Sequence, residues 1–503
     1  MNQRYCSSGN FNALNKYLNS FLPDDPAKYS TEIVYNTDVK LENFILHVGV
    51  GGFHRSHQAY AIHQMNKKVE LGKRWGIYGV GLRPEEKPFY KKLDSQSYLY
   101  TLFSRCNSYT RVEVIDVIQG FFFVPDHDKN ELWNKVLTPQ IRVISCTVTE
   151  KGYHMTAEHR LNLKNTEIQH DLQNWKDGVT APKTFFGFLC TFLKKAKDEH
   201  FDPITVLCCD NLIHNGELCK SLCLEFCHQV DQELAKYIEE SIAFPNSMVD
   251  RITPYTTNTD RFMLQVNYNI FDDIPVVCEN YISWVIENKF SSLVPDWNYM
   301  PFVTITDQPE LYEAQKLLLL NSTHSFMSYL GLLHGIEYVF EFMMEPKLVK
   351  LLENYMDEII VSLDECPELN YQEYKKTILK RFENHYIKDE LSRIAQDGSQ
   401  KLKMTLSKCL LYFFELKKEV HYLPFFLALF VHFMQSAHHK INDPMYEELS
   451  EVKCDSNESI AIFFQNIFPP YFAKWNEILE RTFFYLKKIE SNIDLYDMMN
   501  EGC

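Results

Sequence analysis

The chain has 503 residues, of which 45% are hydrophobic and 23% charged, and its formal net charge at pH 7 is −16. This length and composition indicate a globular protein of two or three domains, and the acidic charge argues against nucleic acid as a partner. The first residues, "MNQRYCSSGNFNALNKYLNSFL", lack the apolar core of a secretory signal, and the most apolar run, 422–434, is too short to span a bilayer. We therefore expect a cytoplasmic protein that binds no membrane and keeps its cysteines reduced.

Strand and helix patterns alternate in the first half of the chain. The first strong strand signal is "FILHVGVGGF" (44–53), which is followed by the helical stretch "HRSHQAYAIHQMNKK" and a second strand, "WGIYGVGL" (75–82). Further strands are expected at 97–103, 111–118, 141–149 and 203–211, and helices at 184–198 and 216–238. This alternation predicts an α/β domain around a largely parallel sheet.

The pattern changes after a proline-containing stretch, 291–310, which we interpret as a linker. Apolar residues then recur with helical spacing over 311–333, 346–362, 371–396, 404–436, 443–453 and 471–490. We therefore expect two domains. The first is a Rossmann-type dinucleotide-binding domain with an N-terminal extension (1–296), and the second is a mainly helical substrate and catalytic domain (297–503).

The turn after the first strand, "GVGGFHR", has glycines where Rossmann domains bind pyrophosphate. Gly49 and Gly51 would supply the tight turn and close backbone approach, and Gly52 and Phe53 would open the helix that faces the anion. His54 stands where the third glycine of GxGxxG is expected, so a plain tight turn is the alternative.

Polar residues also follow later strands. Glu85 and Glu86 come after the second strand, where a carboxylate would accept from the adenosine ribose and repel the extra phosphate of NADP. We expect NAD on this basis, although two exposed loop glutamates are nearly as good an interpretation. Asn211 in "CCDNLIHNGE" could donate to a developing oxyanion at the sheet edge. Asp250 in "FPNSMVDRITP" is a candidate cofactor contact, or half of a structural ion pair with the next arginine.

The stretch "EAQKLLLLNSTHS" (313–325) places three polar side chains around a leucine run. At ~100° per residue, with Lys316 at 0°, His324 lies near ~80° and Asn321 near ~140°. The three side chains would share one wide arc of a helix. Either that arc faces solvent, or it forms a proton-transfer constellation.

Three cysteines recur every fourth residue in "ELCKSLCLEFCHQV". Cys219, Cys223 and Cys227, with His228 next, could be read as metal ligands. Apolar residues precede each cysteine at the same spacing, which is typical of the buried stripe of an amphipathic helix. We therefore expect no metal.

Taken in order, "HVGVGGFHRSHQ", "TVLCCDNLIHNGE", "FPNSMVDRITP" and "KLLLLNSTHSFMSYLG" resemble the long-chain polyol dehydrogenases, of which mannitol 2-dehydrogenase is the type. The resemblance runs from about residue 44 to 402. It implies a metal-independent NAD(P) enzyme with a Rossmann-type first domain and a helical second domain, commonly a monomer. The last hundred residues follow the family only loosely.

By motif, the resemblance makes Lys316 the general base, Asn211 and Asn321 the oxyanion pair, and His324 the histidine that orients the substrate. "DELSRIAQDGSQKL" resembles a segment whose arginine and lysine contact the sugar chain, and "TVTEKGY" resembles one whose carboxylate moves protons. The residues that these two segments supply are Arg393, Lys401 and Glu150.

The resemblance implies NAD-dependent interconversion of a polyol and a ketose, with D-mannitol and D-fructose expected first. Hexuronate reductases for fructuronate or tagaturonate and arabinitol dehydrogenases share the same motifs and remain alternatives. Outside the enzymes, a catalytically silent NAD-sensing protein is the alternative. A purely structural helical scaffold would not explain the glycine turn.

Overall fold

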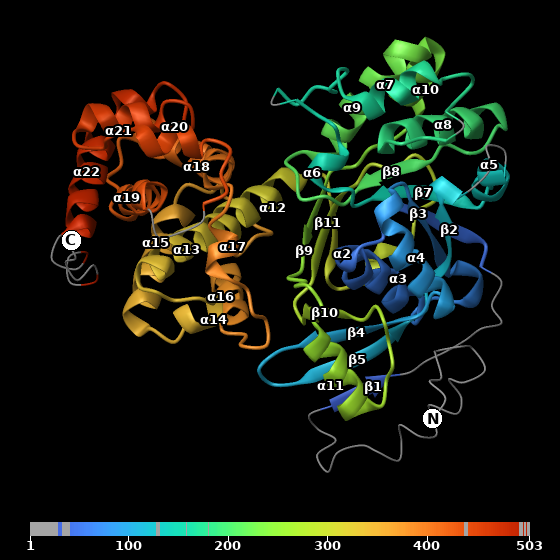
Figure 1. Cartoon of the computed structure of the whole chain (residues 1–503), viewed down its shortest axis with the longest axis horizontal. Helices are drawn as coiled ribbons and strands as arrows, with labels where there is room; N and C mark the ends of the chain where they lie inside the picture. The colour runs from blue at the N-terminus through green and yellow to red at the C-terminus, as the bar shows by residue number, and fades with distance from the viewer. Residues whose placement is uncertain are drawn as a thin grey trace. The chain divides into compact units, whose positions relative to one another are not determined.

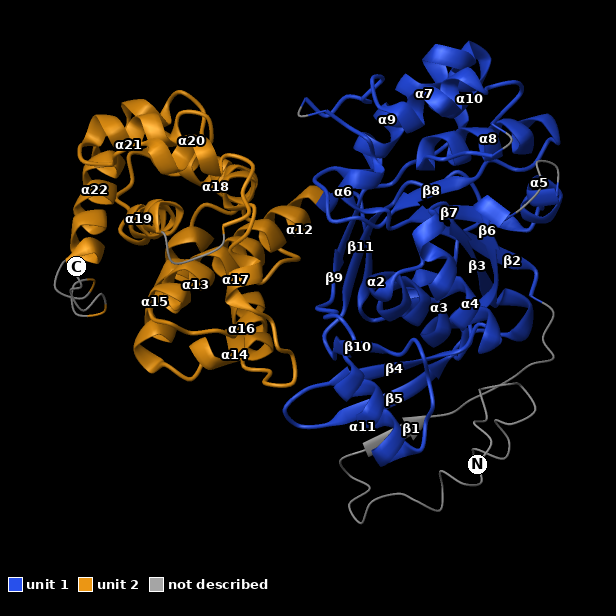
Figure 2. Ribbon diagram, viewed as in Figure 1, with its two compact units in different colours: residues 1–309 blue, residues 310–503 orange. Residues whose placement is uncertain are grey.

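The structure, a computed structural model, describes residues 29–32, 41–126, 131–156, 158–179, 181–436, 441–491, 496 and 499. The chain divides into two compact units, 1–309 and 310–503 (Figure 2). This division falls later than the expected boundary after residue 296. The reason is β12 (Val303–Thr306), which pairs in parallel with β11 (Ser283–Glu287), so the stretch interpreted as a linker completes a sheet of the first unit.

A five-stranded parallel sheet forms the centre of the first unit. Its order is β6-β3-β2-β7-β8. The bounds of these strands are β2 (Asn43–Val48), β3 (Trp75–Gly81), β6 (Ile118–Phe123), β7 (Ile141–Cys146) and β8 (Thr205–Cys208). The predicted α/β class and Rossmann-like sheet are confirmed.

Side chains of the central strand alternate between two cores, as the pleat of a strand requires. Phe44 and Leu46 of β2 pack in one core with helices α8 (Phe185–Asp198), α9 (Asn215–Val230) and α10 (Gln232–Ser241). Ile45 packs on the opposite face, in the core that also holds residues of α3 (Gln58–Asn66) and α4 (Lys87–Ser95) (Figure 1). The sheet is therefore covered on both sides, as parallel sheets are.

The predicted helix at 216–238 is two helices. Asp231 has an extended backbone between α9 and α10, and its side chain accepts a hydrogen bond from the backbone N–H of Leu234 at 2.9 Å. An aspartate in that position caps the start of the second helix, so the apolar periodicity continues through a break in the backbone.

Two smaller sheets complete the first unit. One has the order β1-β5-β4-β10 and the other β12-β11-β9. Their remaining strands are β1 (Tyr29–Glu32), β4 (Tyr100–Arg105), β5 (Thr110–Ile115), β9 (Ser247–Asp250) and β10 (Val276–Glu279). The shorter helices of this unit are α2 (Gly52–Ser56), α5 (Glu131–Val136), α6 (Thr149–Gly152), α7 (Thr166–Gln173) and α11 (Asn258–Tyr268).

Within its described residues the second unit is helical, as predicted. Its helices are α12 (Pro309–Gln315), which begins one residue before the unit boundary, α13 (Ser322–Leu333), α14 (Val339–Phe342), α15 (Pro346–Ile360), α16 (Tyr371–Phe382), α17 (Leu391–Ile394), α18 (Gly398–Leu416), α19 (Tyr422–Gln435), α20 (Tyr446–Glu451), α21 (Asn457–Phe464) and α22 (Asn476–Glu490). The apolar run at 422–434 forms α19, which is buried in the core of this unit. In the part of the chain that the structure describes, no helix combines the length and the apolar character needed to cross a membrane.

Candidate functional site

The glycine turn lies at the carboxyl end of β2. Gly49 has φ +91°, and a Cβ there would lie 2.4 Å from the carbonyl oxygen of Thr147, so both the conformation and the space require glycine. A Cβ on Gly51 or Gly52 would meet nothing closer than 3.9 or 3.8 Å. The backbone at these two residues is therefore open to an approaching group, at the N-terminus of α2, as pyrophosphate binding needs.

The turn also stands where the strand order reverses. Starting from β2, the chain adds β3 and β6 on one side of the sheet and β7 and β8 on the other. Ligands of open parallel sheets bind at the carboxyl ends of the strands at such a point. Thr147, just after β7, donates its hydroxyl to the carbonyl of Gly49 at 2.8 Å, which joins the two strand ends.

His54 replaces the third glycine of the fingerprint by packing its ring inside the domain. It is buried and stacks on His47 of β2, with ring centroids 3.5 Å apart. Burial lowers the pKa of His47 to about 3, and burial followed by the proximity of His47 lowers the pKa of His54 well below its usual value. Both rings are therefore neutral at physiological pH, and together they fill the space between helix and sheet.

Asp210 organises the carboxyl edge beside Asn211. Its buried carboxylate accepts hydrogen bonds from the backbone N–H of Val148 at 3.1 Å and of Thr149 at 2.8 Å, and from the Tyr153 hydroxyl at 2.9 Å. Burial raises the pKa of Asp210, and these three hydrogen bonds oppose the rise. The aspartate thereby fixes the end of β7 to the end of β8.

Thr149 has φ +62°, a left-handed conformation that is an outlier for a β-branched residue. Glu150 follows it, exposed at the start of α6. Asn211 is exposed directly after Asp210, and the amide of Asn215 holds the same loop by donating to the Asp210 carbonyl at 2.9 Å. Glu150 therefore directly follows the backbone that Asp210 holds, and Asn211 directly follows Asp210 itself.

The "VDR" segment places a structural arginine. Asp250 is buried at the end of β9, and Arg251 donates to the backbone oxygens of Ser56 at 2.5 Å and Glu279 at 3.0 Å. Its guanidinium also lies 4.7 Å from the ring centre of Tyr60. Arg251 thus attaches the end of α2 to β10, a role that the sequence analysis did not assign.

The two glutamates after β3 differ in their surroundings. The carboxylate of Glu86 accepts from the backbone N–H of Arg83 at 2.8 Å, and burial raises its pKa. Glu85 is exposed. Glu86 is therefore held against its own turn, whereas Glu85 is exposed to solvent just after the strand end.

In the second unit, Lys316–Asn321 forms a π-helical turn between α12 and α13. In a π turn the backbone hydrogen bond joins residues i and i+5. Asn321 therefore lies on the same face as Lys316, one turn further along, as residue i+4 would in an α-helix. His324 follows Asn321 by three residues on α13. The three side chains thus share a narrower face than the arc expected for a regular helix.

The widened turn is stabilised by its buried side. Leu318, Leu319 and Leu320 lie in the core of the second unit, and Lys316 is buried beside them, with 7% of its surface exposed. The hydroxyl of Ser322 donates to the carbonyl of Leu318 and accepts from the Tyr355 hydroxyl at 2.8 Å. The Ser322 hydroxyl therefore satisfies a backbone carbonyl of the turn, and the buried Tyr355 hydroxyl holds that serine in place.

The other predicted residues of this unit lie on α13 or on helices that pack against it. The ring of His324 stacks on Phe382, with centroids 4.5 Å apart. Arg393 donates from Nε to Asp389 at 3.1 Å, and Lys401 donates to the carbonyl of Ile394 at 2.8 Å. Burial lowers the pKa of Lys401. The elements that carry Arg393 and Lys401, α17 and α18, both pack against α13.

The sequence analysis overlooked a carboxylate close to the lysine. Glu313 lies three residues before Lys316, on α12, which runs directly into the π turn. Residues at this spacing share one side of a helix. The i, i+3 spacing was visible in the sequence and could have identified Glu313. The carboxylate that the resemblance suggested for moving protons, Glu150, belongs to the first unit.

Comparisons with known proteins cover most of the chain. The Mannitol dehydrogenase Rossmann domain matches residues 43–299, and the Mannitol dehydrogenase C-terminal domain matches 309–469. The mannitol 2-dehydrogenase of Aspergillus oryzae is 36% identical over 414 residues, which are 80% of this chain and 82% of that protein. That of Pyricularia oryzae is 34% identical over the same shares. The chain belongs to the mannitol dehydrogenase family.

Similarity to solved structures covers almost the whole chain. The mannitol 2-dehydrogenase of Pseudomonas fluorescens, solved with NAD and D-mannitol, is 31% identical, with a TM-score of 0.79 over 97% of this chain and 98% of that one. A substrate-free D-sorbitol dehydrogenase is 27% identical, with a TM-score of 0.82 over 93% and 98%. The mannitol dehydrogenase resemblance also continues to residue 469, past residue 402 where the sequence analysis ended it.

Proposed function

We propose that this chain is an NAD-dependent dehydrogenase that interconverts D-mannitol and D-fructose. As a member of the mannitol dehydrogenase family it is an NAD-dependent polyol dehydrogenase. The single observation that carries the choice of substrate is the similarity to mannitol 2-dehydrogenases in both domains. The open backbone at Gly51 and Gly52 fits the pyrophosphate of NAD. When bound, NAD supplies the nicotinamide ring that accepts the hydride. Phe53 and Asp250 complete the proposed cofactor contacts.

Lys316 is the proposed general base. It takes the proton of the substrate hydroxyl while the same carbon loses a hydride, and it returns that proton to the ketose carbonyl in the reverse direction. The Nζ of a lysine must be neutral for this task, and Lys316 is buried beside the leucines of the run. Asn321 and Asn211 are proposed to donate their amides to the oxygen as it gains charge, which needs no metal.

His324, Arg393 and Lys401 are the proposed substrate contacts. His324 follows Asn321 by one helical turn and is held by Phe382, so its ring has a fixed orientation toward a sugar hydroxyl. The proposed path for the released proton uses a carboxylate, either Glu150 or, within the same unit as the lysine, Glu313.

A polyol or neutral ketose suits the described residues better than a hexuronate. A hexuronate needs a cation for its carboxylate, and the guanidinium of Arg393 already donates to Asp389 through Nε and Nη2. Lys401 donates to a backbone carbonyl, and burial lowers its pKa. These contacts favour mannitol and fructose, with arabinitol second.

A substrate panel tests the proposal. D-fructose, D-fructuronate and D-tagaturonate would be offered with NADH, and D-mannitol, D-sorbitol and D-arabinitol with NAD, with reduced cofactor followed by absorbance. We expect D-mannitol and D-fructose to give the highest kcat/KM. A preference for fructuronate would identify a hexuronate reductase. NAD binding without turnover of any substrate would favour the NAD-sensing alternative.

The proposal includes a cytoplasmic monomer that needs no metal. Dialysis against a chelator should leave the activity unchanged, and light scattering across a dilution series should give one mass near 59.4 kDa. Activity that is lost to the chelator and restored by zinc would contradict metal independence. A mass of twice the monomer value at every concentration would contradict the monomer.

A further inference from the structure

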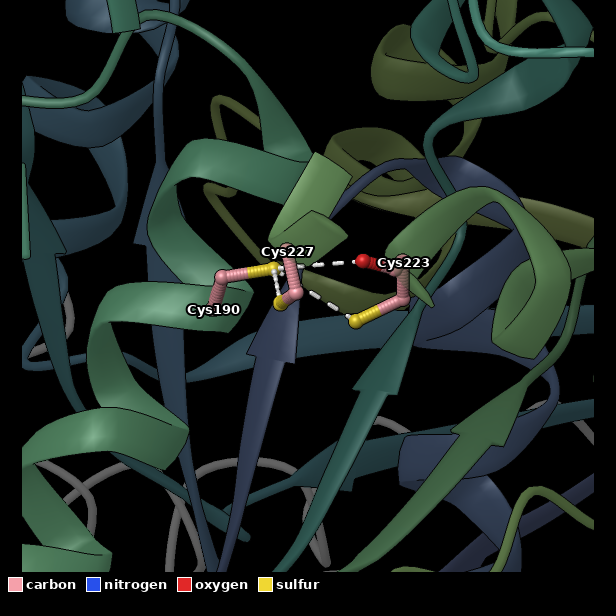
Figure 3. Close-up of side chains that lie close together, drawn as sticks. All are labelled: Cys190, Cys223 and Cys227. Atoms are coloured by element: carbon pink, nitrogen blue, oxygen red, sulfur yellow. Dashed lines mark hydrogen bonds between the residues drawn. The ribbon is translucent and has the colours of Figure 1, made fainter. Parts of the chain in front are cut away.

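Three thiols meet in the core of the first unit, away from the glycine turn and the strand ends. Cys190 of α8 has its Sγ 3.5 Å from that of Cys223 and 3.3 Å from that of Cys227, both on α9 (Figure 3). All three residues are completely buried. We call Cys190, Cys223 and Cys227 the thiol triad.

The fold, and not the helical stripe alone, creates this group. The sequence placed Cys219, Cys223 and Cys227 on one helix, but the triad replaces Cys219 with a cysteine from a different helix. In the described part of the chain, the candidate metal ligands that gather here within 4.8 Å of one another are these three sulfurs. A site with this geometry therefore offers three sulfur ligands and no carboxylate or imidazole.

The charge of the surroundings limits what could bind. The triad lies in an apolar core with Phe188, Leu222 and Phe226. Burial, and then the hydrogen bonds with Cys223 and Cys227, raise the pKa of Cys190 well above its usual value. Three thiolates around a divalent ion would leave a net negative charge in this core, which costs several kcal/mol. A trivalent centre bound to three thiolates is neutral.

The distances between the sulfurs also favour a trivalent centre. A closed zinc site has four ligands, and a tetrahedron with Zn–S bonds of ~2.3 Å separates the sulfurs by about 3.8 Å. Trivalent arsenic binds three sulfurs as a pyramid with narrower angles, so its sulfurs lie closer together than those of a tetrahedral zinc site. The Cys190 sulfur lies 3.5 Å from that of Cys223 and 3.3 Å from that of Cys227, which is closer than the tetrahedral separation, and all three sulfurs lie within 4.8 Å of one another.

We propose that the thiol triad is a binding site for a trivalent thiophilic centre, of which arsenous acid is the test ligand. The reaction is a condensation without any oxidant. Three thiols and As(OH)₃ give As(S–Cys)₃ and three waters, as each sulfur forms one bond to arsenic and each S–H proton leaves on a departing hydroxide. Arsenous acid is uncharged near neutral pH, so it can enter an apolar core without carrying charge there.

Burial also sets how fast the site reacts. The sulfurs of the triad are covered by α8 and α9, so arsenic reaches them through local opening of these helices. Binding should therefore be slow, and a subdenaturing concentration of urea should accelerate it. Once bound, arsenic joins α8 to α9 in the native state, so the midpoint of thermal unfolding of the first unit should rise.

The test uses the full-length protein, reduced and freed of small thiols, incubated with sodium arsenite. Arsenic retained after gel filtration is measured by mass spectrometry, and X-ray absorption gives the number of sulfur neighbours. We expect one arsenic per chain with three As–S bonds and no As–O bond. Cys190→Ala and Cys223→Ala lie on different helices, and either one should reduce retained arsenic at least tenfold if it folds.

Two controls separate the triad from other buried thiols. Cys409→Ala removes a buried cysteine of the second unit and should leave one arsenic per chain. Cys146→Ala removes one of the thiols that gather with Cys208 and Asp210, and should also leave binding unchanged. Arsenic lost from Cys146→Ala but kept by Cys223→Ala would overturn the assignment.

The wild-type protein alone can also overturn the proposal. Two As–S bonds with one oxygen neighbour would mean that a pair of thiols binds, and not the triad. No retained arsenic after incubation in subdenaturing urea would mean that the three cysteines serve as core packing. A lowered unfolding midpoint would show that arsenic binds thiols of the unfolded chain in preference to the native site.

Discussion

The two units present their candidate residues by different physical means. In the first, Asn211 stands on a loop and Glu150 in the short helix α6, and a buried polar side chain, Asp210, fixes the backbone before Glu150 through two of its three hydrogen bonds. In the second, Lys316 and Asn321 stand on a helix whose local π turn brings them to one face. The loop arrangement relies on individual hydrogen bonds, whereas the helical one relies on the number of residues in a turn.

This difference predicts what each arrangement tolerates. Loops held by single hydrogen bonds should respond to the loss of one polar group and to pH. A π turn should respond to an added residue, because the extra residue rotates Asn321 away from Lys316. The predictions below test these two sensitivities, beginning with the side chain on which the helical arrangement depends.

Replacing Lys316 should have the largest effect. Lys316→Ala should lower kcat for mannitol oxidation by a factor of about 10²–10⁴, the usual contribution of a positioned acid–base group. The pH profile should lose the ionisation seen in the wild type, whereas the Kd for NADH, measured by fluorescence, should change little. Lys403→Ala, an exposed lysine on α18, is the matched control. A folded Lys316→Ala variant with near wild-type turnover would remove the lysine from the mechanism.

Lengthening the π turn should have the next largest effect. Inserting one alanine after Leu317, the half-buried leucine of the run, should move Asn321 one position further along the turn and rotate it by about 100° relative to Lys316. We expect kcat to fall by about 10², since misplacing a catalytic group by ångströms has effects of this size. Leu317→Ala changes the same position and keeps the chain length, so it should retain most of the activity. Equal losses in the two variants would show that packing, and not the turn, matters.

The sequence indicated the chemistry of both regions but not the geometry that serves it. The glycine turn and the first strands of the parallel sheet were predictable because buried apolar strands and a glycine-rich turn leave local patterns. The π turn was not, because a regular 100° step fits "KLLLLN" equally well, and the contact of the adjacent Ser322 with Tyr355 of α15 exists only in the fold. The thiol triad was also hidden, since Cys190 joins it only through the fold.

The same reasoning explains the two boundaries that differed. A proline-rich stretch looks like a linker until β12 finds its partner strand, and that pairing is a long-range contact. The helix expected at 216–238 divides at Asp231 although its apolar spacing continues. A long-range strand pairing sets the first boundary and a local helix cap sets the second, and the apolar spacing of the sequence shows neither.

Acid should affect the first unit through its stacked histidines. The folded pKa of His47 is about 3 and that of His54 is also lowered, mainly by burial, whereas an unfolded histidine titrates near ~6.5. The unfolded chain therefore binds more protons below pH ~6.5, and stability must fall as pH falls from there toward 3. Each histidine contributes a slope of at most about 1.4 kcal/mol per pH unit.

His54→Phe isolates one of these two slopes. Phenylalanine keeps the ring stacked on His47 but cannot take a proton, so the free energy of unfolding should depend less on pH between about 6 and 4. Urea titrations followed by tryptophan fluorescence report mainly the first unit, because five of the six tryptophans, all but Trp475, lie before residue 310. His228→Phe, on the exposed side of α9, is the control and should keep the wild-type pH dependence. An unchanged slope in His54→Phe would contradict the assignment.

Cofactor choice should give the smallest effect and involve the first unit alone. Glu86 is held by the backbone N–H of Arg83, so the exposed Glu85 is the carboxylate placed to repel a 2′-phosphate. Glu85→Ala should raise kcat/KM for NADP relative to NAD by about 10-fold, the effect of ~1.4 kcal/mol, and Arg83 would then meet the added phosphate.

The matched variant is Glu86→Gln, which keeps the hydrogen bond to Arg83 and should shift the ratio by less. The KM for mannitol should stay constant in both variants, because the proposed sugar contacts His324, Arg393 and Lys401 belong to the second unit. If neither glutamate variant changes the NADP to NAD ratio, the preference for NAD arises elsewhere in the turn. If the KM for mannitol changes as well, the two units do not divide cofactor and substrate between them.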